Sequence, residues 1–212
     1  MTFRLENILP VGFPQNVPKE TVWNRILEIR TRDTHILTGT SGRGKSTFLH
    51  ILSGIRKDFS GILSIDGINT AQYAAKKWAE LRQDFFAIVF QDLRLIPHLT
   101  PIQNFTLKTN LTQGTPSKQI ESYAERLEIQ ECLHKRCSKL SFGQQQRVAI
   151  IRALIQPFRF LLLDEPFSHL DPENTQRSLD LIKEVADQND SGILLTTLND
   201  DHGVTPDRYL TV

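Results

Sequence analysis

The sequence has 212 residues, of which 39% are hydrophobic and 23% charged, and these proportions are typical of a folded globular protein. They exclude an intrinsically disordered chain and a low-complexity or fibrous repeat. Lys and Arg number 25 and Asp and Glu 24, so the net charge of +1 provides no global attraction for nucleic acid or an anionic membrane.

The apolar runs, such as those at residues 148–151 and 160–163, are far shorter than the roughly 20 residues of a membrane-spanning helix. The N-terminal stretch contains Glu6, Pro10 and Pro14, so it lacks the unbroken apolar run of a secretion signal. We therefore expect a cytoplasmic protein.

Elements of secondary structure alternate along the chain. Residues 3–30 are interrupted by three prolines, which favours edge strands and turns. Apolar runs predict further strands, and periodic patterns predict helices, including two in a helical stretch from 99 to about 151. The expected strands are 35–38, 62–67 (ending in a hairpin), 86–90, 160–163 and 193–196, and the expected helices are 45–55, 118–127, 144–154 and 175–188.

Strands that alternate with helices predict an α/β fold with a mostly parallel wound sheet. The N-terminal part is expected to form an antiparallel β portion, and residues 92–150, approximately, a helical insertion.

Cys132 and Cys137 flank His134 in a C-x-H-x-x-C arrangement. A structural zinc site needs four ligands, and no second pair lies nearby. We therefore expect reduced thiols on a helix and the loop that follows it, with metal binding as the weaker alternative.

The expected strand 35–38 leads into a phosphate-binding loop. The run fits G-x-x-x-x-G-K-S and stands between a strand and a helix, where the backbone N–H groups and the helix N-terminus can bind phosphates. Lys45 would reach the β and γ phosphates, and the Ser46 hydroxyl would take one Mg²⁺ position. The motif alone leaves kinase, GTPase and ATPase open. Its residues are Gly39, Thr40, Ser41, Gly42, Arg43, Gly44, Lys45 and Ser46.

Two carboxylates follow the apolar run 160–163, at the sheet edge where α/β proteins hold their ligands. Asp164 is suited to hold Mg²⁺ through water. Glu165 is suited to orient and deprotonate a water molecule that attacks the γ phosphate.

Between these motifs lies Leu140-Ser141-Phe142-Gly143-Gln144, followed by Gln145-Gln146-Arg147. Here the chain resembles the ATP-binding cassette (ABC) ATPases, whose LSGGQ signature stands just upstream of an acidic strand. GTSGRGKS, Gln91, LSFGQQQR, LLLDEP and Ser168-His169-Leu170-Asp171 occur in the family's order and cover essentially the whole chain. The loop from Phe90 to Thr100, with Asn104, resembles the branch that serves lipoprotein release, macrolide efflux and cell division.

The resemblance implies a P-loop NTPase that binds ATP and Mg²⁺. It implies one ABC ATPase domain over 1–212, with a RecA-like core at about 1–91 and 152–212 and a helical subdomain at about 92–151. It also implies head-to-tail pairing with a second cassette, which we expect to be an identical chain. In this pairing Ser141, Gly143, Gln144 and Asp171 of one subunit close over the nucleotide of the other.

Read from its residues alone, the signature has a plain physical sense. Ser141 precedes a helix and can donate its hydroxyl, and the first amides of that helix form an anion-binding end.

The family resemblance implies further site residues. They are Thr47 beside the phosphate loop and Gln91 as a Mg²⁺ ligand and catalytic residue.

Three positions depart from the family pattern or leave it open. Phe142 replaces a signature glycine, which we expect to be tolerated because the backbone N–H survives. Leu198, in the run from Leu194 to Asn199, occupies the place of a histidine that contacts the γ phosphate in the family. His202 is the alternative for that role, although a histidine in a polar segment is more often simply solvated.

An aromatic residue is implied to stack on adenine, and Phe13 is the first candidate, with Trp23 as the alternative. We interpret the chain as the ATPase subunit of an ABC complex, peripheral on the inner face of the cell membrane and docked on permease-like membrane subunits. A scaffold cassette that binds ATP but hydrolyses it slowly is the first alternative. A DNA or ribosome protein is disfavoured because no basic arm or coiled-coil insertion is present, so no nucleic-acid partner is expected.

Overall fold

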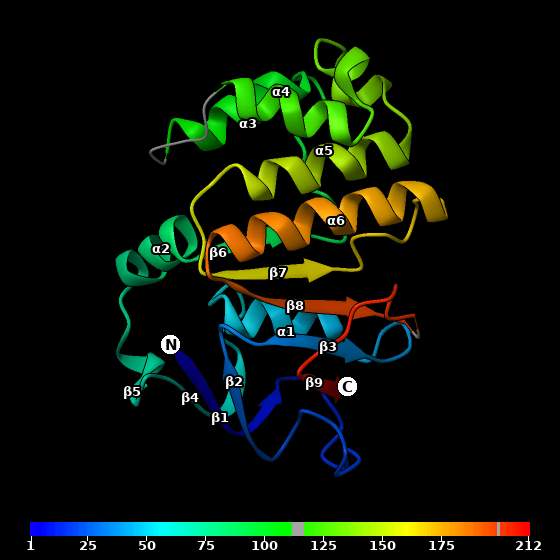
Figure 1. Ribbon diagram of the computed structural model, residues 1–212. Helices are drawn as coiled ribbons and strands as arrows, with labels where there is room; N and C mark the ends of the chain where they lie inside the picture. Colours follow the sequence, from blue (N-terminus) through cyan, green and yellow to red (C-terminus); the bar gives the residue numbers. More distant parts are fainter. Residues whose placement is uncertain (112–116, 199) are drawn as a thin grey trace.

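A computed structural model describes residues 1–111, 117–198 and 200–212 (Figure 1). It contains a five-stranded parallel sheet with the order β6-β7-β8-β3-β9 and a four-stranded antiparallel sheet with the order β2-β1-β4-β5. The α/β fold class, with its N-terminal antiparallel portion, is thereby confirmed. The strands are β1 (Thr2–Pro10), β2 (Ile26–Arg30), β3 (Thr34–Thr38), β4 (Phe59–Ile65), β5 (Ile68–Asn69), β6 (Phe86–Val89), β7 (Phe160–Asp164), β8 (Gly192–Thr197) and β9 (Arg208–Thr211).

Six α-helices are described, together with three short 3₁₀ turns. The α-helices are α1 (Lys45–Leu52), α2 (Ala75–Asp84), α3 (Pro101–Thr109), α4 (Ser117–Arg126), α5 (Phe142–Leu154) and α6 (Pro172–Gln188). The 3₁₀ turns are η1 (Thr70–Gln72), η2 (Gln130–Cys132) and η3 (Cys137–Lys139). Within the described ranges, none of these helices is long and apolar enough to cross a membrane.

The inner strand β7 is buried on both faces because its side chains alternate between two hydrophobic clusters. Leu161 and Leu163 join the cluster that α5 and α6 cover. Phe160 and Leu162 join the cluster formed with α1 and the antiparallel sheet. Figure 1 shows α5 and α6 on one side of the parallel sheet and α1 on the other.

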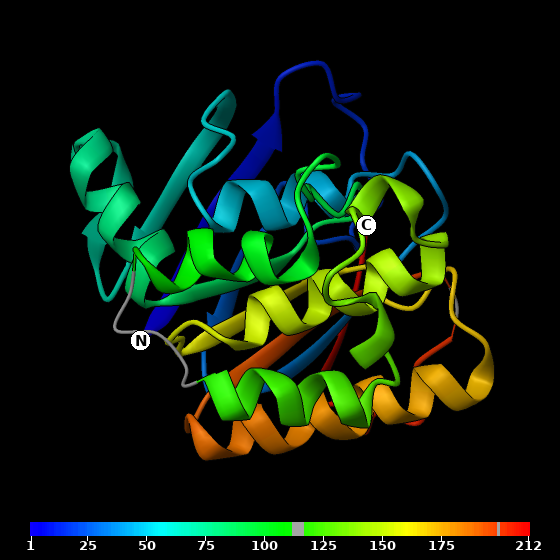
Figure 2. The ribbon, with the colours of Figure 1, turned by 90° about the horizontal axis from the view of Figure 1, so that it is seen from above.

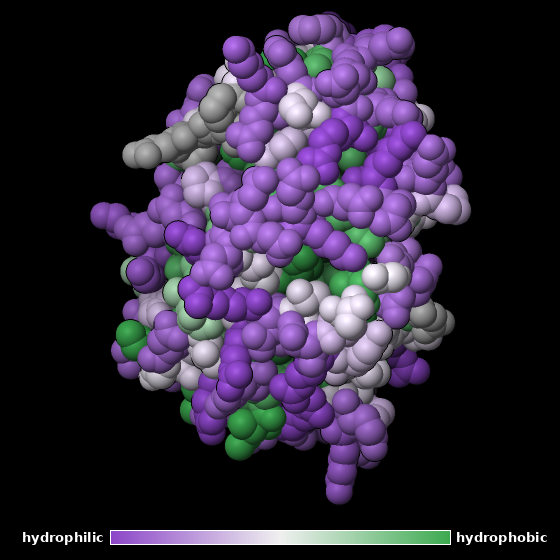
Figure 3. Space-filling model, viewed as in Figure 1, coloured by the Kyte–Doolittle hydropathy of each residue, from purple (hydrophilic) through white to green (hydrophobic). Residues whose placement is uncertain are grey.

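The helices α3 and α4 form a layer over α5 and α6. Seen from above, α4 runs alongside α6 (Figure 2), and Arg126 of α4 is ion-paired with Glu184 of α6 at 2.8 Å. Buried residues of α3, α4, α5 and α6 belong to one hydrophobic cluster. The outer surface over α6 consists mainly of hydrophilic side chains (Figure 3).

The structure differs from the sequence prediction in the N-terminal region. β1 pairs with both β2 and β4, so it is an inner strand, and the expectation of edge strands was wrong for it. Pro10 is tolerated because it is the last residue of β1. α2 and β9 were not predicted.

Candidate functional site

The phosphate-binding loop connects β3 to α1, as the motif predicts. Gly42 and Gly44 have φ values of 78° and 108°, a backbone region that a residue with a side chain rarely adopts. The loop lines a pocket of about 240 Å³ at the N-terminus of α1. Its loop residues are Ser41, Gly42, Gly44, Lys45, Ser46 and Thr47.

Lys45 lies at the bottom of this pocket, with only 4% of its side chain exposed. Its Nζ donates to the carbonyl oxygens of Gly39 and Thr40, at 2.6 and 3.3 Å. Nζ also lies 3.0 Å from Oε1 of Glu165. The loop carbonyls and Glu165 thus fix the ammonium at the place where phosphate would bind.

Gln91 and Glu165 complete the pocket from two neighbouring strands, β6 and β7. The Gln91 side chain accepts from the Ser46 hydroxyl at 3.4 Å and donates to Oε2 of Glu165 at 3.4 Å. Gln91 therefore connects the phosphate loop to the acidic strand end. These four residues, Lys45, Ser46, Gln91 and Glu165, come together as the sequence predicted.

Asp164 is the last residue of β7 and is 3% exposed. Its Oδ1 accepts from the Thr196 hydroxyl at 2.8 Å, and the same hydroxyl accepts from the backbone N–H of Glu165 at 3.0 Å. Glu165 has a φ of 46°, an unusual conformation for a side-chain-bearing residue. Strain of this kind often marks functional sites, where the surrounding contacts hold it in place.

The donor set at this edge fits Mg²⁺, which prefers oxygen ligands and keeps several waters. The Ser46 hydroxyl and the Gln91 amide oxygen lie within 3.4 Å of each other. Asp164 supplies a nearby carboxylate at the end of β7, suited to contact through water. The predicted ligands Ser46, Gln91 and Asp164 are therefore chemically compatible with this ion.

Phe13 lines the phosphate pocket, whereas Trp23 is part of the hydrophobic core. Trp23 is 2% exposed, and its ring packs edge-on against Phe13 at 5.3 Å and Phe48 at 5.7 Å. The Phe13 ring also covers Gly44, where a Cβ atom would lie 2.8 Å from it. Of the two aromatic candidates for the adenine, Phe13 has the better placement.

The signature residues do not line the phosphate pocket of their own chain. Ser141 caps α5 and forms a capping box with Gln144, with hydrogen bonds of 3.2 and 2.9 Å. Phe142 is 47% exposed, and its ring lies 4.2 Å from that of His169. Gly143 approaches the His169 carbonyl so closely that a Cβ atom would lie 3.0 Å from it.

Asp171 caps the N-terminus of α6. Its two carboxylate oxygens accept from the backbone and side-chain N–H groups of Asn174, at 2.8 and 2.7 Å. These hydrogen bonds lower the pKa of Asp171. Its predicted nucleotide contact stays a prediction.

Two contacts near Glu165 were missed at the sequence level. One is the Thr196 hydroxyl described above. The other is Gln146, 1% exposed, which donates to the carbonyl of Glu165 at 3.2 Å and accepts from the N–H of His169 at 3.1 Å. Gln146 could have been found from the sequence because it is a polar residue on the otherwise apolar face of the predicted helix 144–154.

The loop after β8 forms a small cleft of about 150 Å³ beside Glu165. Leu198 and His202 both line it, and Asn199 lies outside the described residues. His202 Nδ1 is 3.3 Å from the Asp200 carboxylate, and the imidazole packs edge-on against Phe167 at 5.0 Å. His202 is therefore not a freely solvated side chain.

The cysteines form no disulfide, as expected, and both are buried. They lie in the 3₁₀ turns η2 and η3, so the expectation of a helix and its following loop was wrong. Cys137 accepts a hydrogen bond from Asn104 at 3.4 Å, and burial raises the pKa of its thiol. In the part of the chain that the structure describes, no three His, Cys, Asp or Glu side chains form a group that could hold a metal ion.

A phosphate loop, an acidic strand end, a connecting glutamine and a capped signature helix together define an ATP-binding cassette. The sequence profile of the ABC transporter family matches residues 24–168, which is more than half of the chain. The chain therefore belongs to the ABC transporter family.

Individual relatives agree with this assignment. The lipoprotein-releasing system ATP-binding protein LolD of Hydrogenovibrio crunogenus is 34% identical over 174 residues, which are 80% of this chain and 75% of LolD. The macrolide export ATP-binding/permease protein MacB of Vibrio parahaemolyticus is 35% identical over 181 residues, 83% of this chain and 28% of MacB. The probable syringafactin export ATP-binding/permease protein SyfD of Pseudomonas syringae is 35% identical over 173 residues, 80% of this chain and 26% of SyfD. The chain thus spans only about a quarter of the length of these two ATP-binding/permease proteins.

The fold agrees with solved structures of the bacterial ABC transporter cassette MJ0796. Its dimeric structure superposes with a TM-score of 0.83 at 27% identity, covering 99% of this chain and 94% of that one. A second structure, a post-hydrolysis state bound to ADP and Pi, gives a TM-score of 0.82 at 27% identity. The P-loop NTPase fold and the ABC ATPase class are therefore confirmed.

Proposed function

We propose that the chain hydrolyses ATP and uses the resulting opening and closing of a cassette dimer to drive membrane permease subunits. The observation that carries this proposal is the convergence of Lys45, Gln91 and Glu165 in one pocket. Each of the three has a separate proposed task in phosphoryl transfer: binding the phosphates, orienting the water and accepting its proton.

In the proposed mechanism, Lys45 and the N-terminus of α1 hold the β and γ phosphates of ATP. Gln91 orients a water molecule, and the Glu165 carboxylate accepts its proton. The water oxygen then bonds to the γ phosphorus, and the bond to the bridging oxygen breaks, releasing ADP and phosphate. Bound Mg²⁺, held by Ser46, Gln91 and Asp164, would neutralise phosphate charge.

The Lys45–Glu165 ion pair has a consequence for this mechanism. ATP phosphates compete with the carboxylate for the ammonium, so binding of the nucleotide frees Glu165 to act as a base. Thr196 and Gln146 hold the backbone of Glu165 in place from both sides. We therefore assign them positioning roles.

The second cassette in this proposal is an identical chain that supplies its signature helix. Ser141 and Phe142 lie outside the phosphate pocket, and the first amides of α5 point away from the helix as an anion-binding end. Head-to-tail pairing would place them over the partner's ATP, together with Gly143, Gln144 and Asp171. The dimeric structure of MJ0796 supports the pairing of two cassettes.

The proposed place of work is the inner face of the cell membrane, on separate permease-like subunits. LolD is named as the ATP-binding protein of a lipoprotein-releasing system, and MacB as an ATP-binding/permease protein. We further propose that residues 92–151 act as the helical subdomain against a core of 1–91 and 152–212. The groove near the Gln91 loop would carry the contact with the permease.

A slow scaffold cassette is the second candidate because Leu198 lines the cleft beside Glu165. A leucine side chain cannot donate a hydrogen bond to a phosphate. Phosphate release from ATP distinguishes the two candidates, measured on the purified chain and on the chain captured with its membrane subunits in mild detergent. If the chain hydrolyses ATP and Glu165→Gln abolishes this turnover, the result supports the ATPase. If the chain dimerises with ATP but shows no turnover, the result supports the scaffold cassette.

A further inference from the structure

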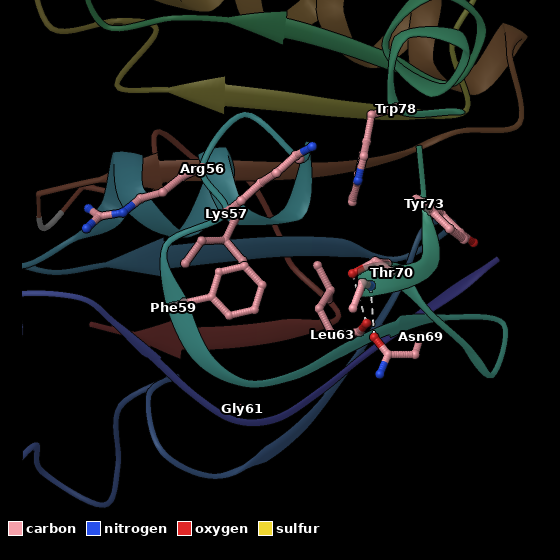
Figure 4. A pocket seen from close by; sticks show the side chains of 12 residues that line it. Arg56, Lys57, Phe59, Gly61, Leu63, Asn69, Thr70, Tyr73 and Trp78 are labelled. Carbon is pink, nitrogen blue, oxygen red and sulfur yellow. Dashed lines mark hydrogen bonds between the residues drawn. The ribbon is translucent and has the colours of Figure 1, made fainter. Parts of the chain in front are cut away.

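A second pocket lies at the opposite end of α1 from the phosphate loop (Figure 4). It has a volume of about 260 Å³ and shares no lining residue with the phosphate pocket. Ile51, Leu63 and Phe59 form apolar walls, and Trp78 closes one side. The proposed ATPase mechanism makes no use of this pocket.

Trp78 is fixed in position by its neighbours. Only 3% of the residue is exposed, and the Tyr73 ring packs edge-on against it at 5.7 Å. Its ring lies directly on the backbone of Gly54, where a Cβ atom would lie 2.2 Å from the indole. Gly54 also has a φ of 65°, so a glycine is needed here on both grounds. The indole wall of the pocket is therefore preorganised.

The indole N–H is a donor without a protein partner. Figure 4 shows the Trp78 nitrogen on the end of the ring that extends toward Thr70 and Leu63. Across residues 1–111, 117–198 and 200–212, no protein atom accepts a hydrogen bond from it. The Thr70 hydroxyl is occupied as a donor to the Leu63 carbonyl at 2.9 Å. The Trp78 nitrogen is not among the buried side-chain atoms that lack a partner, so its N–H is open to the pocket and offers one hydrogen-bond donor to a ligand.

The charge of the pocket is positive. Lys57 extends across its upper side toward Trp78 (Figure 4) and has no ion pair in the described residues. Arg56 also lines the pocket, but its guanidinium is turned away and pairs with Asp58 at 2.9 Å. No Asp or Glu is among the described lining residues. An acceptor that carries a negative charge satisfies both Trp78 and Lys57.

We propose that this pocket binds a small organic carboxylate with an apolar, preferably aromatic, body. The carboxylate would accept from the Trp78 N–H and lie within the field of Lys57, while the body packs against Ile51, Phe59 and Leu63. One indole donor and one ammonium match the single charge of a carboxylate. A phosphate dianion requires more donors than this pocket supplies.

Benzoate is the probe for this proposal, with benzamide as its neutral analogue and benzylamine as its cationic one. The chain contains two tryptophans, so its ¹H–¹⁵N spectrum has two indole signals, which Trp78→Phe assigns. We expect benzoate to shift the Trp78 signal and leave the Trp23 signal in place, and both analogues to bind more weakly. A shift confined to Trp23, no shift, or equal binding of benzamide overturns the proposal.

Two variants then test the two contacts, with the amide signals of Gly61 and Ala71 as the readout. Trp78→Phe keeps an aromatic ring but removes the donor, and should weaken benzoate binding about tenfold. Lys57→Met keeps the chain length but removes the charge on an exposed side chain, and should weaken binding about threefold. Lys76→Met, on the exposed side of α2, is the matched control and should have no effect. Undiminished binding in Lys57→Met overturns the assignment even where Trp78→Phe folds poorly.

Discussion

Lys45 and Glu165 form an ion pair of 3.0 Å between the phosphate loop and the end of β7, with side chains that are 4% and 13% exposed. Because both groups are largely buried, each depends on the other for charge compensation. A change to either one therefore affects the remaining partner as well as the nucleotide.

Lys45→Ala should weaken ATP binding by about 10–100-fold, because a charge-assisted contact to the phosphates is lost. Titration calorimetry measures the affinity, and circular dichroism establishes that the fold is retained. Lys76→Ala, an exposed lysine on α2, serves as the control. Equal ATP affinity of Lys45→Ala and the parent would remove the phosphate loop from the mechanism.

Glu165→Gln should bind ATP at least as well as the parent but lose turnover by about 10²-fold or more, since an amide cannot accept the proton. The Lys45 ammonium also becomes fully available to the phosphates. Size-exclusion chromatography with light scattering should detect an ATP-dependent dimer, and Glu173→Gln on α6 is the control. A monomer at all ATP concentrations would contradict head-to-tail pairing through Ser141.

Leu198→His should raise turnover with little change in ATP affinity, because a histidine there would donate to the γ phosphate. One such contact is typically worth about 10²–10³ in rate. Phosphate release is measured with the membrane subunit present where one is found. His202→Ala is the companion variant, since His202 lines the same cleft. If the parent already hydrolyses ATP rapidly, gains nothing from Leu198→His and is slowed by His202→Ala, then His202 is the residue that contacts the γ phosphate.

Thr196→Val should lower both stability and turnover. The Thr196 hydroxyl is hydrogen-bonded to Asp164 and to the N–H of Glu165, and its loss leaves two buried polar groups unsatisfied. We expect a loss of about 1–3 kcal/mol in the free energy of unfolding, measured with urea. Thr31→Val removes one buried hydroxyl that bonds only the Met1 carbonyl, so it should leave turnover unchanged.

Stability should fall as the pH falls below about 6.5, the ordinary pKa of histidine. Burial lowers the pKa of His35 in the folded protein, and His50 is shifted in the same direction. The unfolded chain therefore binds protons first, and the loss continues until the lowered folded pKa is reached. Urea unfolding at about pH 7.5 and about pH 5.5 measures this. His35→Gln should show a smaller loss than the parent, and an identical loss would contradict the assignment.

The sequence predicted those elements whose apolar pattern is continuous. β7 and β8 are runs of buried residues, so their assignment needed no tertiary information. In contrast, α2 buries only Trp78 and Leu81 and β9 buries only Leu210, which leaves too little pattern to recognise. The position of β1 inside its sheet depends on pairing with β4, and the prolines at and after the end of β1 gave no indication of this pairing.

In the candidate site, too, local motifs were predictable from the sequence, whereas contacts that depend on strand pairing were not. Motif spacing placed Lys45, Ser46 and Glu165, because each lies directly at the end of a predicted element. The role of Thr196 depends on strand register, since β7 and β8 pair Asp164 with Thr196. No local signal in the sequence specifies that register. The Lys45–Glu165 pair likewise depends on tertiary structure, because the order of the strands brings the phosphate loop close to the end of β7.

α5 connects two distant parts of the molecule mechanically. Ser141 caps its first turn, and near its other end the half-buried Arg152 donates to the carbonyls of Leu93 and Arg94, just after Gln91. A helix of 13 residues is a stiff rod of about 20 Å. In the proposed dimer, a displacement of the signature end would therefore be transmitted through α5 to the loop that follows Gln91, so that contact with the second cassette and the position of this glutamine would be coupled.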